Sequence, residues 1–163
     1  MIFPFPDRIY KDVTRITPSE LKKMGIKGLL LDIDGTLART KDPGLTKAVE
    51  GWIGSLKEHG IKLFVLSNNK SPVRTESFAK KIGCAWRHRS RKPSRKGFFK
   101  AAEELKLRPS EIAIVGDQIF TDVLGGLRSG MKTLMVGSKD TYLWYFPLRR
   151  LLELPFRFER RRK

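Results

Sequence analysis

The sequence has only one cysteine and no long apolar run. A single cysteine, Cys84, among 163 residues leaves no partner for an internal disulfide, which fits a reducing compartment. The apolar runs fall far short of the roughly 18 to 20 residues that a membrane-spanning helix needs. The first residues, MIFPFPDRIYKDV, lack the basic region and apolar core of a signal peptide. These absences predict a cytoplasmic protein without a membrane-spanning helix.

Acidic residues are scarce relative to basic ones. The chain has 17 Asp and Glu against 34 Lys and Arg, which gives a net charge of +17 and a pI near 10.4. Such a balance favours anionic partners, namely phosphorylated substrates, nucleic acid or the acidic face of a membrane. The sequence contains no repeat and no long linker, so we expect residues 1–163 to form a single domain.

The sequence alternates two kinds of segment. Short apolar, β-branched runs predict strands at Gly28–Ile33, Ile61–Leu66, Glu111–Val115 and Lys132–Val136, with a weaker one at Cys84–Arg87. Helical patterns occur at Thr46–His59, Pro72–Ile82, Ser94–Leu105 and Thr121–Ser129. Strands that alternate with helices of this length predict an α/β fold with a central parallel sheet.

Polar residues follow three of the predicted strands. They are Asp32 and Asp34 at the end of the first, Ser67 and Asn68 after the second, and Asp117 and Asp122 after Glu111–Val115. In open α/β sheets ligands bind at the carboxyl ends of the strands, so we expect these residues to form one site. Lys92, just before the helix Ser94–Leu105, can bring an ammonium group to the same place, although Lys96 competes with it for that role.

These residue types fit phosphoryl transfer. A carboxylate such as Asp32 can attack phosphorus and form an aspartyl-phosphate, while Asp34 can protonate the leaving oxygen and then activate water. Crowded carboxylates need a hard cation, and oxygen ligands from Asp32 and Asp117 suit Mg²⁺. The hydroxyl of Ser67 and the amides after it can hold phosphoryl oxygens, and Lys92 can offset the charge of the transition state.

In their order along the chain, these motifs resemble those of the haloacid dehalogenase-like (HAD) phosphatases. The motifs are Asp32-Ile33-Asp34-Gly35-Thr36, Ser67 after its strand, Lys92, and Gly116-Asp117 with Asp122. The resemblance spans roughly residues 28–136 and implies a Rossmann-like three-layer fold. It also implies that Asp32 is the nucleophile and that Asp34 is the general acid/base and offers its backbone carbonyl to Mg²⁺. Asp117 would be a further ligand, whereas Asp122 can touch the metal, orient its neighbours or cap a helix.

A narrower resemblance is carried by LSNN at 66–69, Arg91-Lys92-Pro93 and GDQIFTDVLGG at 116–126. These segments are similar to the small YqeG-type branch, which is related to phosphatases that convert phosphatidylglycerophosphate to phosphatidylglycerol. That similarity implies a lipid phosphomonoester as substrate. HAD enzymes of small metabolites usually carry a cap domain, but here one helix and one strand use most of each interval between motifs. We therefore expect a capless fold with an open site.

The C-terminal segment at about 141–163 mixes aromatic, leucine and arginine residues, as in YLWYFPLRRLL at 142–152 and FRFERRRK at 156–163. This mixture is typical of an interfacial anchor, which Ile2, Phe3, Phe5 and Tyr10 can join. It predicts peripheral association with anionic lipid headgroups at the inner face of the cytoplasmic membrane. The same segment can instead pack on the sheet or form a dimer contact.

Two other functions fit parts of the sequence. A net charge of +17 and an open site also suit a phosphatase of nucleic-acid ends or of phosphoproteins, although no nucleic-acid module is recognisable. A non-catalytic scaffold would keep the fold alone, but the presence of Asp32, Asp34, Lys92 and Asp117 argues against it.

Overall fold

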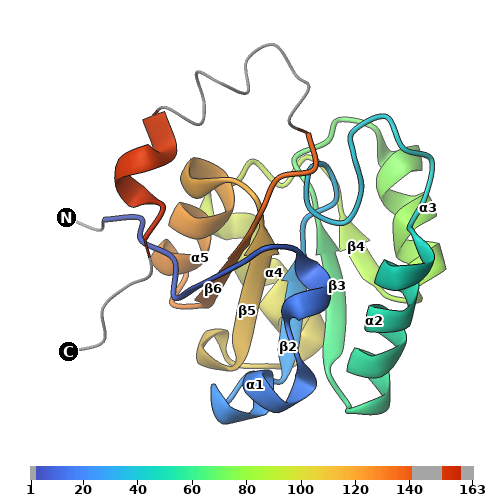
Figure 1. Cartoon of the computed structure of the whole chain (residues 1–163), viewed down its shortest axis with the longest axis horizontal. Helices are drawn as coiled ribbons and strands as arrows, with labels where there is room; N and C mark the ends of the chain where they lie inside the picture. The colour runs from blue at the N-terminus through green and yellow to red at the C-terminus, as the bar shows by residue number, and fades with distance from the viewer. Residues whose placement is uncertain (1–2, 141–151, 159–163) are drawn as a thin grey trace.

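The computed structural model describes residues 3–140 and 152–158, and its centre is a six-stranded sheet (Figure 1). The order across the sheet is β1-β6-β5-β2-β3-β4, and all neighbouring strands are parallel. The strands are β1 (Arg8–Tyr10), β2 (Gly28–Leu31), β3 (Lys62–Leu66), β4 (Ala85–Arg87), β5 (Ile112–Gly116) and β6 (Lys132–Val136). This architecture confirms the predicted α/β fold. Except for 152–158, the predicted C-terminal segment lies outside the described residues, as does Ile2.

Strand β2 has a central position that determines where the site lies. All four of its residues are buried, and Leu31 lies in register with Val65 of β3 and Val115 of β5. Because the three strands run in the same direction, the residues that follow them emerge together at one edge of the sheet. Strand β2 ends at Leu31, two residues earlier than predicted, so Asp32 is the first residue of the loop.

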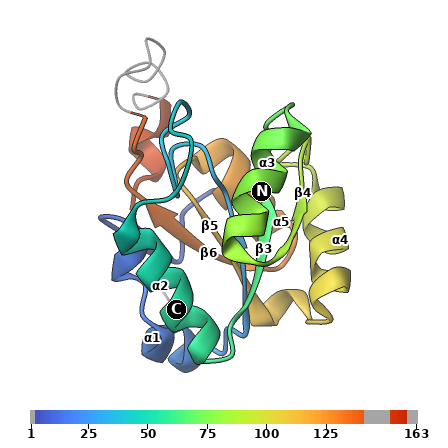
Figure 2. The same ribbon diagram turned by 90° about the vertical axis from the view of Figure 1, so that its right-hand side faces the viewer.

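Helices cover both faces of the sheet. Helices α2 (Lys47–Glu58) and α3 (Pro72–Ile82) cover one face, and α4 (Arg95–Leu105) and α5 (Leu124–Arg128) cover the other. Figure 2 shows α2 and α4 on opposite sides of the strands. Side chains of β2 alternate between two cores, with Leu29 and Leu31 in one and Leu30 in the other. A strand that is buried on both faces has no polar alternation, which explains its continuous leucine run.

The N-terminal residues form three elements that the sequence did not predict: β1, a 3-10 helix at Val13–Arg15 and the short helix α1 (Pro18–Lys23). Strand β1 has only three residues and exists through its pairing with β6. The side chain of Asp7 accepts hydrogen bonds from the N–H and the hydroxyl of Thr133, at 2.9 and 3.1 Å, and ties this segment to β6. The strand depends on contacts with residues far away in the sequence, so no local pattern indicates it.

The predicted helix Thr121–Ser129 differs from the structure at its start. A π-helical turn covers Ile119–Val123, and α5 follows it. The N–H of Val123 lies 3.2 Å from the carbonyl of Gln118, which is the five-residue spacing of a π-helix. Apolar periodicity cannot distinguish such a turn from an α-helix, and the turn carries Asp122, whose contacts are described below.

The described loops contain no inserted domain. Residues 32–46, before α2, and residues 67–71, before α3, hold no helix or strand beyond one isolated bridge between Asp34 and Ala38. Among the described residues, no inserted domain covers the edge of the sheet at the carboxyl ends of the strands, which agrees with the predicted capless fold. In the part of the chain that the structure describes, no helix is both long and apolar enough to cross a bilayer.

Candidate active site

A lysine joins two carboxylates at the carboxyl ends of the central strands. Lys92 Nζ lies 2.6 Å from Asp32 Oδ1 and 2.7 Å from Asp122 Oδ1. It also donates a hydrogen bond to the backbone carbonyl of Leu66 at 2.9 Å. All three charged side chains are at most 8% exposed. Residues that are far apart in the sequence thus form one buried ionic group.

Burial and the contacts among these three side chains shift the pKa of each of them. Burial raises the pKa of Asp32 to about 7, and it also raises the pKa of Asp122, while Lys92 opposes both shifts. Burial alone would lower the pKa of Lys92, but the carboxylates of Asp122 and Asp32 outweigh it and raise that pKa. The lysine therefore stays charged, whereas the carboxyl groups resist being ionised together.

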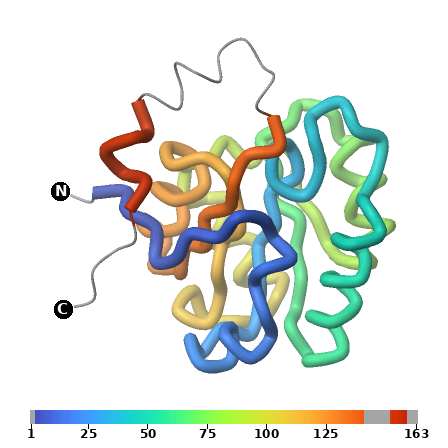
Figure 3. The backbone as a smooth tube through the Cα atoms, viewed as in Figure 1, coloured from blue at the N-terminus to red at the C-terminus, as the bar shows by residue number. Residues whose placement is uncertain are grey.

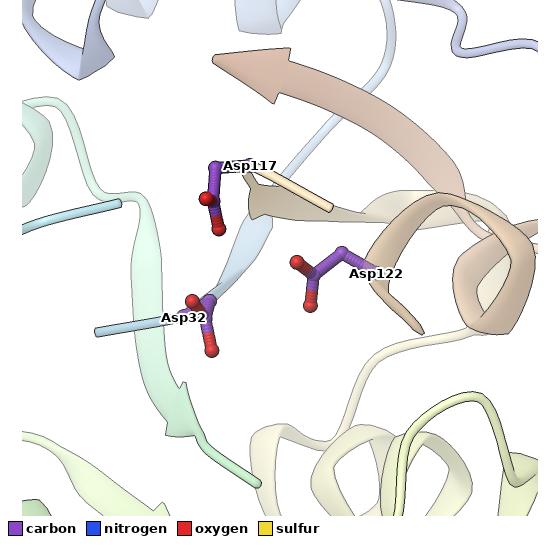
Figure 4. Close-up of side chains that lie close together, drawn as sticks. All are labelled: Asp32, Asp117 and Asp122. Atoms are coloured by element: carbon purple, nitrogen blue, oxygen red, sulfur yellow. The ribbon is translucent and has the colours of Figure 1, made fainter. Parts of the chain in front are cut away.

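Asp117 completes a cluster of three buried carboxylates, shown in Figure 4. One oxygen each from Asp32, Asp117 and Asp122 lies within 4.8 Å of the other two. The hydroxyl of Thr36 connects two of them, at 3.2 Å from Asp32 Oδ2 and 3.3 Å from Asp117 Oδ1. The cluster therefore joins the loops that follow β2 and β5.

Two glycines leave room for these carboxylates. A Cβ atom at Gly116 would lie 2.3 Å from the carboxyl carbon of Asp122, closer than real atoms approach. At Gly35 the φ angle is +85°, and a Cβ atom would lie 2.6 Å from Asp117 Oδ2. Glycine is therefore required at both positions, by space at Gly116 and by space and backbone conformation at Gly35.

The carboxylate cluster fits a divalent cation. If all three carboxylates are ionised, one ammonium leaves two negative charges unbalanced, which is costly in a buried site. Carboxylate oxygens are the ligands that hard cations such as Mg²⁺ prefer. Both oxygens of Asp122 already have partners, Lys92 and the N–H of Gln118 at 3.2 Å. Both oxygens of Asp32 also have partners, Lys92 and Thr36, so these contacts do not rank the three carboxylates as ligands.

Asp34 lies in the loop that follows Asp32 and has a separate set of partners. Its Oδ1 accepts a hydrogen bond from Arg74 Nε at 2.8 Å, and its Oδ2 accepts one from Asn69 Nδ2 at 2.9 Å. The Arg74 guanidinium also donates to the carbonyls of Arg39 and Asp42, at 2.9 and 2.6 Å. Sequence reasoning missed Arg74, because a single arginine in the first turn of a helix carries no signal of its own.

Ser67 and Asn68 organise the loop beside the lysine. Ser67 is buried, and its hydroxyl accepts a hydrogen bond from the N–H of Asn69 at 3.0 Å. The Asn68 side chain donates to the carbonyl of Lys92 at 3.1 Å and accepts from its N–H at 2.7 Å. Asn68, which we predicted to belong to the site, uses its side-chain amide to hold the backbone of Lys92. Lys96 is exposed on α4, so the structure places Lys92 and not Lys96 beside Asp32.

The loop before Lys92 has a strained backbone. Arg89 and Arg91 have φ angles of 44° and 54°, which residues other than glycine rarely adopt. The N–H of Arg89 donates to the carbonyl of Asn69, and the N–H of Ser90 donates to the carbonyl of Ser67, both at 3.0 Å. Such conformations persist where surrounding contacts impose them, and they are concentrated at functional sites.

A family model matches about half of the chain, including Lys92, Asp117 and Asp122. Residues 45–130 match the model of the haloacid dehalogenase-like hydrolases. A solved structure of CbbY from Rhodobacter sphaeroides, in complex with phosphate, has a similar fold. Its TM-score is 0.58 at 15% identity, over 72% of this chain and 89% of that one.

Two curated relatives extend the comparison over most of the chain. The chain is 36% identical over 147 residues to a protein of Bacillus subtilis (strain 168) described as "Probable phosphatase YqeG", with 88% of this chain and 85% of the relative covered. It is 29% identical over 146 residues to the chloroplastic/mitochondrial phosphatidylglycerophosphate phosphatase 1 of Arabidopsis thaliana. That match covers 82% of this chain but only 40% of the plant protein.

Proposed function

Because this chain belongs to the haloacid dehalogenase-like hydrolases, we propose that it is a Mg²⁺-dependent phosphomonoesterase that forms an aspartyl-phosphate on Asp32. The observation that carries this proposal is the buried Lys92–Asp32 pair beside Asp117 and Asp122. A carboxylate, a fixed cation and two further acids at one open edge of the sheet are what phosphoryl transfer requires.

In the proposed reaction Asp32 attacks the phosphorus of a phosphate monoester, and the bond from phosphorus to the ester oxygen breaks. Asp34 gives a proton to that oxygen, and the alcohol leaves. Asp34 then takes a proton from water, whose oxygen attacks the aspartyl-phosphate, releases inorganic phosphate and restores Asp32.

Other residues of the site stabilise charge during this reaction. Lys92 holds Asp32 and offers its ammonium to the phosphoryl oxygens, while the Ser67 hydroxyl and nearby amides lie at the same edge. Mg²⁺, held by Asp32, Asp117 and the backbone carbonyl of Asp34, would neutralise charge on the transferred group.

The proposed substrate is phosphatidylglycerophosphate, presented at an anionic membrane surface on the cytoplasmic side. The plant relative supports this substrate by its description, and the uncapped edge of the sheet leaves room for a large substrate. The net charge of +17 also suits a phosphorylated polynucleotide or phosphoprotein, so these substrates must be compared directly.

The test is Mg²⁺-dependent phosphate release from four substrates in parallel. They are phosphatidylglycerophosphate in mixed micelles, a 3′-phosphorylated oligonucleotide, a phosphopeptide and a soluble aryl phosphate, with Asp32→Asn as the blank. We expect fastest turnover of the lipid, loss of activity in EDTA, and recovery when Mg²⁺ is restored. Preference for the oligonucleotide or the phosphopeptide would overturn the lipid assignment. Release that persists in EDTA would contradict the metal requirement.

Arg74 is expected to position Asp34 rather than to contact the substrate. Replacing Arg74 with glutamine removes the charge and most of the contacts to Asp34 and to the carbonyls of Arg39 and Asp42. Misplacement of an acid by about 1 Å can cost roughly a hundredfold in rate, so kcat should fall tenfold to a hundredfold while KM changes little.

Steady-state kinetics with the aryl phosphate measures this effect. Lys81→Gln, in the last turn of the same helix, is the control because Lys81 contacts the carbonyl of Pro43 but not Asp34. A rise in KM with an unchanged kcat would show that Arg74 binds substrate instead.

A further inference from the structure

Exposed apolar side chains are concentrated in three short segments of the described chain. The large hydrophobic residues exposed among residues 3–140 and 152–158 are Phe3, Val73, Phe99, Phe120, Leu152, Leu154 and Phe158. All but Val73 and Phe99 belong to the N-terminus, to the π-helical turn after β5, or to residues 152–158. Phe3, Leu152 and Phe158 are 59%, 59% and 66% exposed, so burial among the described residues does not explain their apolar character.

The three segments meet at Phe156. The ring centroid of Phe156 lies 5.8 Å from that of Phe5 and 5.8 Å from that of Phe120, and Phe3 lies 6.4 Å from Phe5. Figure 3 shows the N-terminal segment beside residues 152–158. We call this surface the aromatic face. It consists of Phe3, Phe5, Phe120, Leu152, Leu154, Phe156 and Phe158.

The aromatic face adjoins the candidate active site. Phe120 lies in the π-helical turn Ile119–Val123, which also contains Asp122 and follows Asp117 closely in the chain. Asp117 and Asp122 are two members of the carboxylate cluster. In the same turn the N–H of Ile119 donates a hydrogen bond at 3.0 Å to the buried carboxylate of Glu153. Residues 152–158 are therefore fixed to the loop that carries two of the site acids, and a partner on this face would lie beside the site.

Exposed cations lie in the loops of the same edge of the sheet. They are Arg39 and Lys41 after β2, Lys70 after β3, and Arg89 and Arg91 after β4. In the sequence the aromatic face is followed by four more cations, Arg160 to Lys163, and is preceded by YLWYFPLRRL at 142–151. The loops at the carboxyl ends of the strands therefore carry exposed cations, and the sequence on either side of residues 152–158 is rich in aromatic and basic residues.

We propose that the aromatic face docks on an anionic lipid bilayer and holds the open site against the headgroups. Phenylalanine and leucine side chains enter the boundary between headgroups and acyl chains, and the exposed cations of the loops at the carboxyl ends of the strands bind anionic headgroups. This proposal rests on the proposed function for the identity of the substrate, a phosphorylated lipid. The docking itself does not require that the protein is catalytically active.

The composition of the face favours a bilayer over the other occupants. Single-stranded nucleic acid is bound by aromatic rings that line a basic groove, whereas these rings pack on one another with leucines beside them. An interface between two copies would bring together the cations of a chain with a net charge of +17, which a surface of anionic lipid instead neutralises.

The test is sedimentation of the full chain with vesicles of phosphatidylcholine, with and without phosphatidylglycerol, at low and high salt. The docking variant is Leu152→Ser/Phe158→Ser. Its matched control, Val73→Ser/Phe99→Ser, removes one aliphatic and one aromatic side chain that are also exposed but belong to α3 and α4. Turnover of a soluble aryl phosphate is measured for every protein.

We expect the wild type and the control to bind the vesicles that contain phosphatidylglycerol, and this binding should weaken at high salt. The docking variant should bind them at least about tenfold more weakly.

Failure of the wild type to bind these vesicles, or equal binding by the docking variant and the control, would overturn the docking. If the wild type formed a dimer without lipid and the docking variant did not, the aromatic face would be a dimer interface instead. If the wild type bound an oligonucleotide and the docking variant did not, the aromatic face would bind nucleic acid instead. Vesicle binding by a wild type that does not hydrolyse the aryl phosphate would overturn the proposed catalysis and support the docking. Hydrolysis of the aryl phosphate by a wild type that does not bind vesicles would overturn only the docking.

Discussion

Asp32→Asn is expected to lower phosphate release at least about a thousandfold while the protein remains folded, because the substitution removes the proposed nucleophile without changing its size. The asparagine oxygen can still accept a hydrogen bond from Lys92, and its amide NH2 can donate one to the hydroxyl of Thr36, so the contacts around this position are largely kept. The substitution also removes one of three crowded carboxylates. Without metal, the variant should therefore be at least as stable as the wild type.

The pH dependence of stability gives this prediction a second measurement. Burial raises the pKa of Asp32 to about 7, above its ordinary value of 3.8. Between these two values the folded state binds more protons than the unfolded state, so this group stabilises the fold at low pH and the contribution is lost as the pH rises through 7. The Tm of the metal-free wild type should therefore fall more from pH 5 to pH 8 than that of Asp32→Asn.

Thermal unfolding in EDTA over this pH range measures the difference. Glu58→Gln, which removes an exposed carboxylate at the end of α2, is the control and should match the wild type in stability and activity. Substantial phosphate release by Asp32→Asn would rule out Asp32 as the nucleophile. Equal pH profiles for variant and wild type would mean that Asp32 ionises as an ordinary surface carboxyl group.

Lys92→Met is expected to have the largest effect on stability. Methionine has a similar length but no charge, so Asp32 and Asp122 lose their buried partner. Breaking a buried ion pair by removing one member costs about 3–5 kcal/mol in free energy of unfolding, because the remaining charge is uncompensated. Activity should fall by about a hundredfold to a thousandfold, the cost of removing one donor to the transition state.

Chemical denaturation without metal, together with aryl phosphate turnover, tests both effects. Lys96→Met is the matched control, since Lys96 is exposed on α4 four residues away and should change neither quantity. Adding Asp122→Asn to Lys92→Met removes one orphaned charge and should recover part of the lost stability but none of the activity. If Lys96→Met were the inactive variant, the lysine of the site would be assigned wrongly.

Part of the site was predictable because local patterns and one rule of topology suffice to locate it. Buried leucines before Asp32 indicate a strand, and strands alternating with helices indicate a parallel sheet. In such a sheet polar residues after neighbouring strands meet at one edge, and Asp32, Lys92, Asp117 and Asp122 do meet there. The roles assigned to these residues remain predictions for the experiments above.

Other features depend on contacts that no sequence interval reveals. Arg74 reaches Asp34 because α3 begins beside the loop after β2, and β1 forms because β6 offers it an edge. The same holds for Asn68, whose side chain binds the backbone of Lys92. In each case the deciding hydrogen bond joins residues that are far apart in the chain, so neither periodicity nor residue type at one position can predict it.

By itself the sequence determined the parallel sheet, the edge at which the acids gather and the family, because these follow from apolar periodicity and from motifs within short segments. Only the tertiary structure decided how charge is distributed at that edge. In the structure Lys92 forms an ion pair with Asp32, Arg74 donates a hydrogen bond to Asp34, and Phe5 packs against Phe156 beside the site. The physical reason is that ion pairs and ring contacts depend on distances of a few ångströms, which only the packing of distant segments sets.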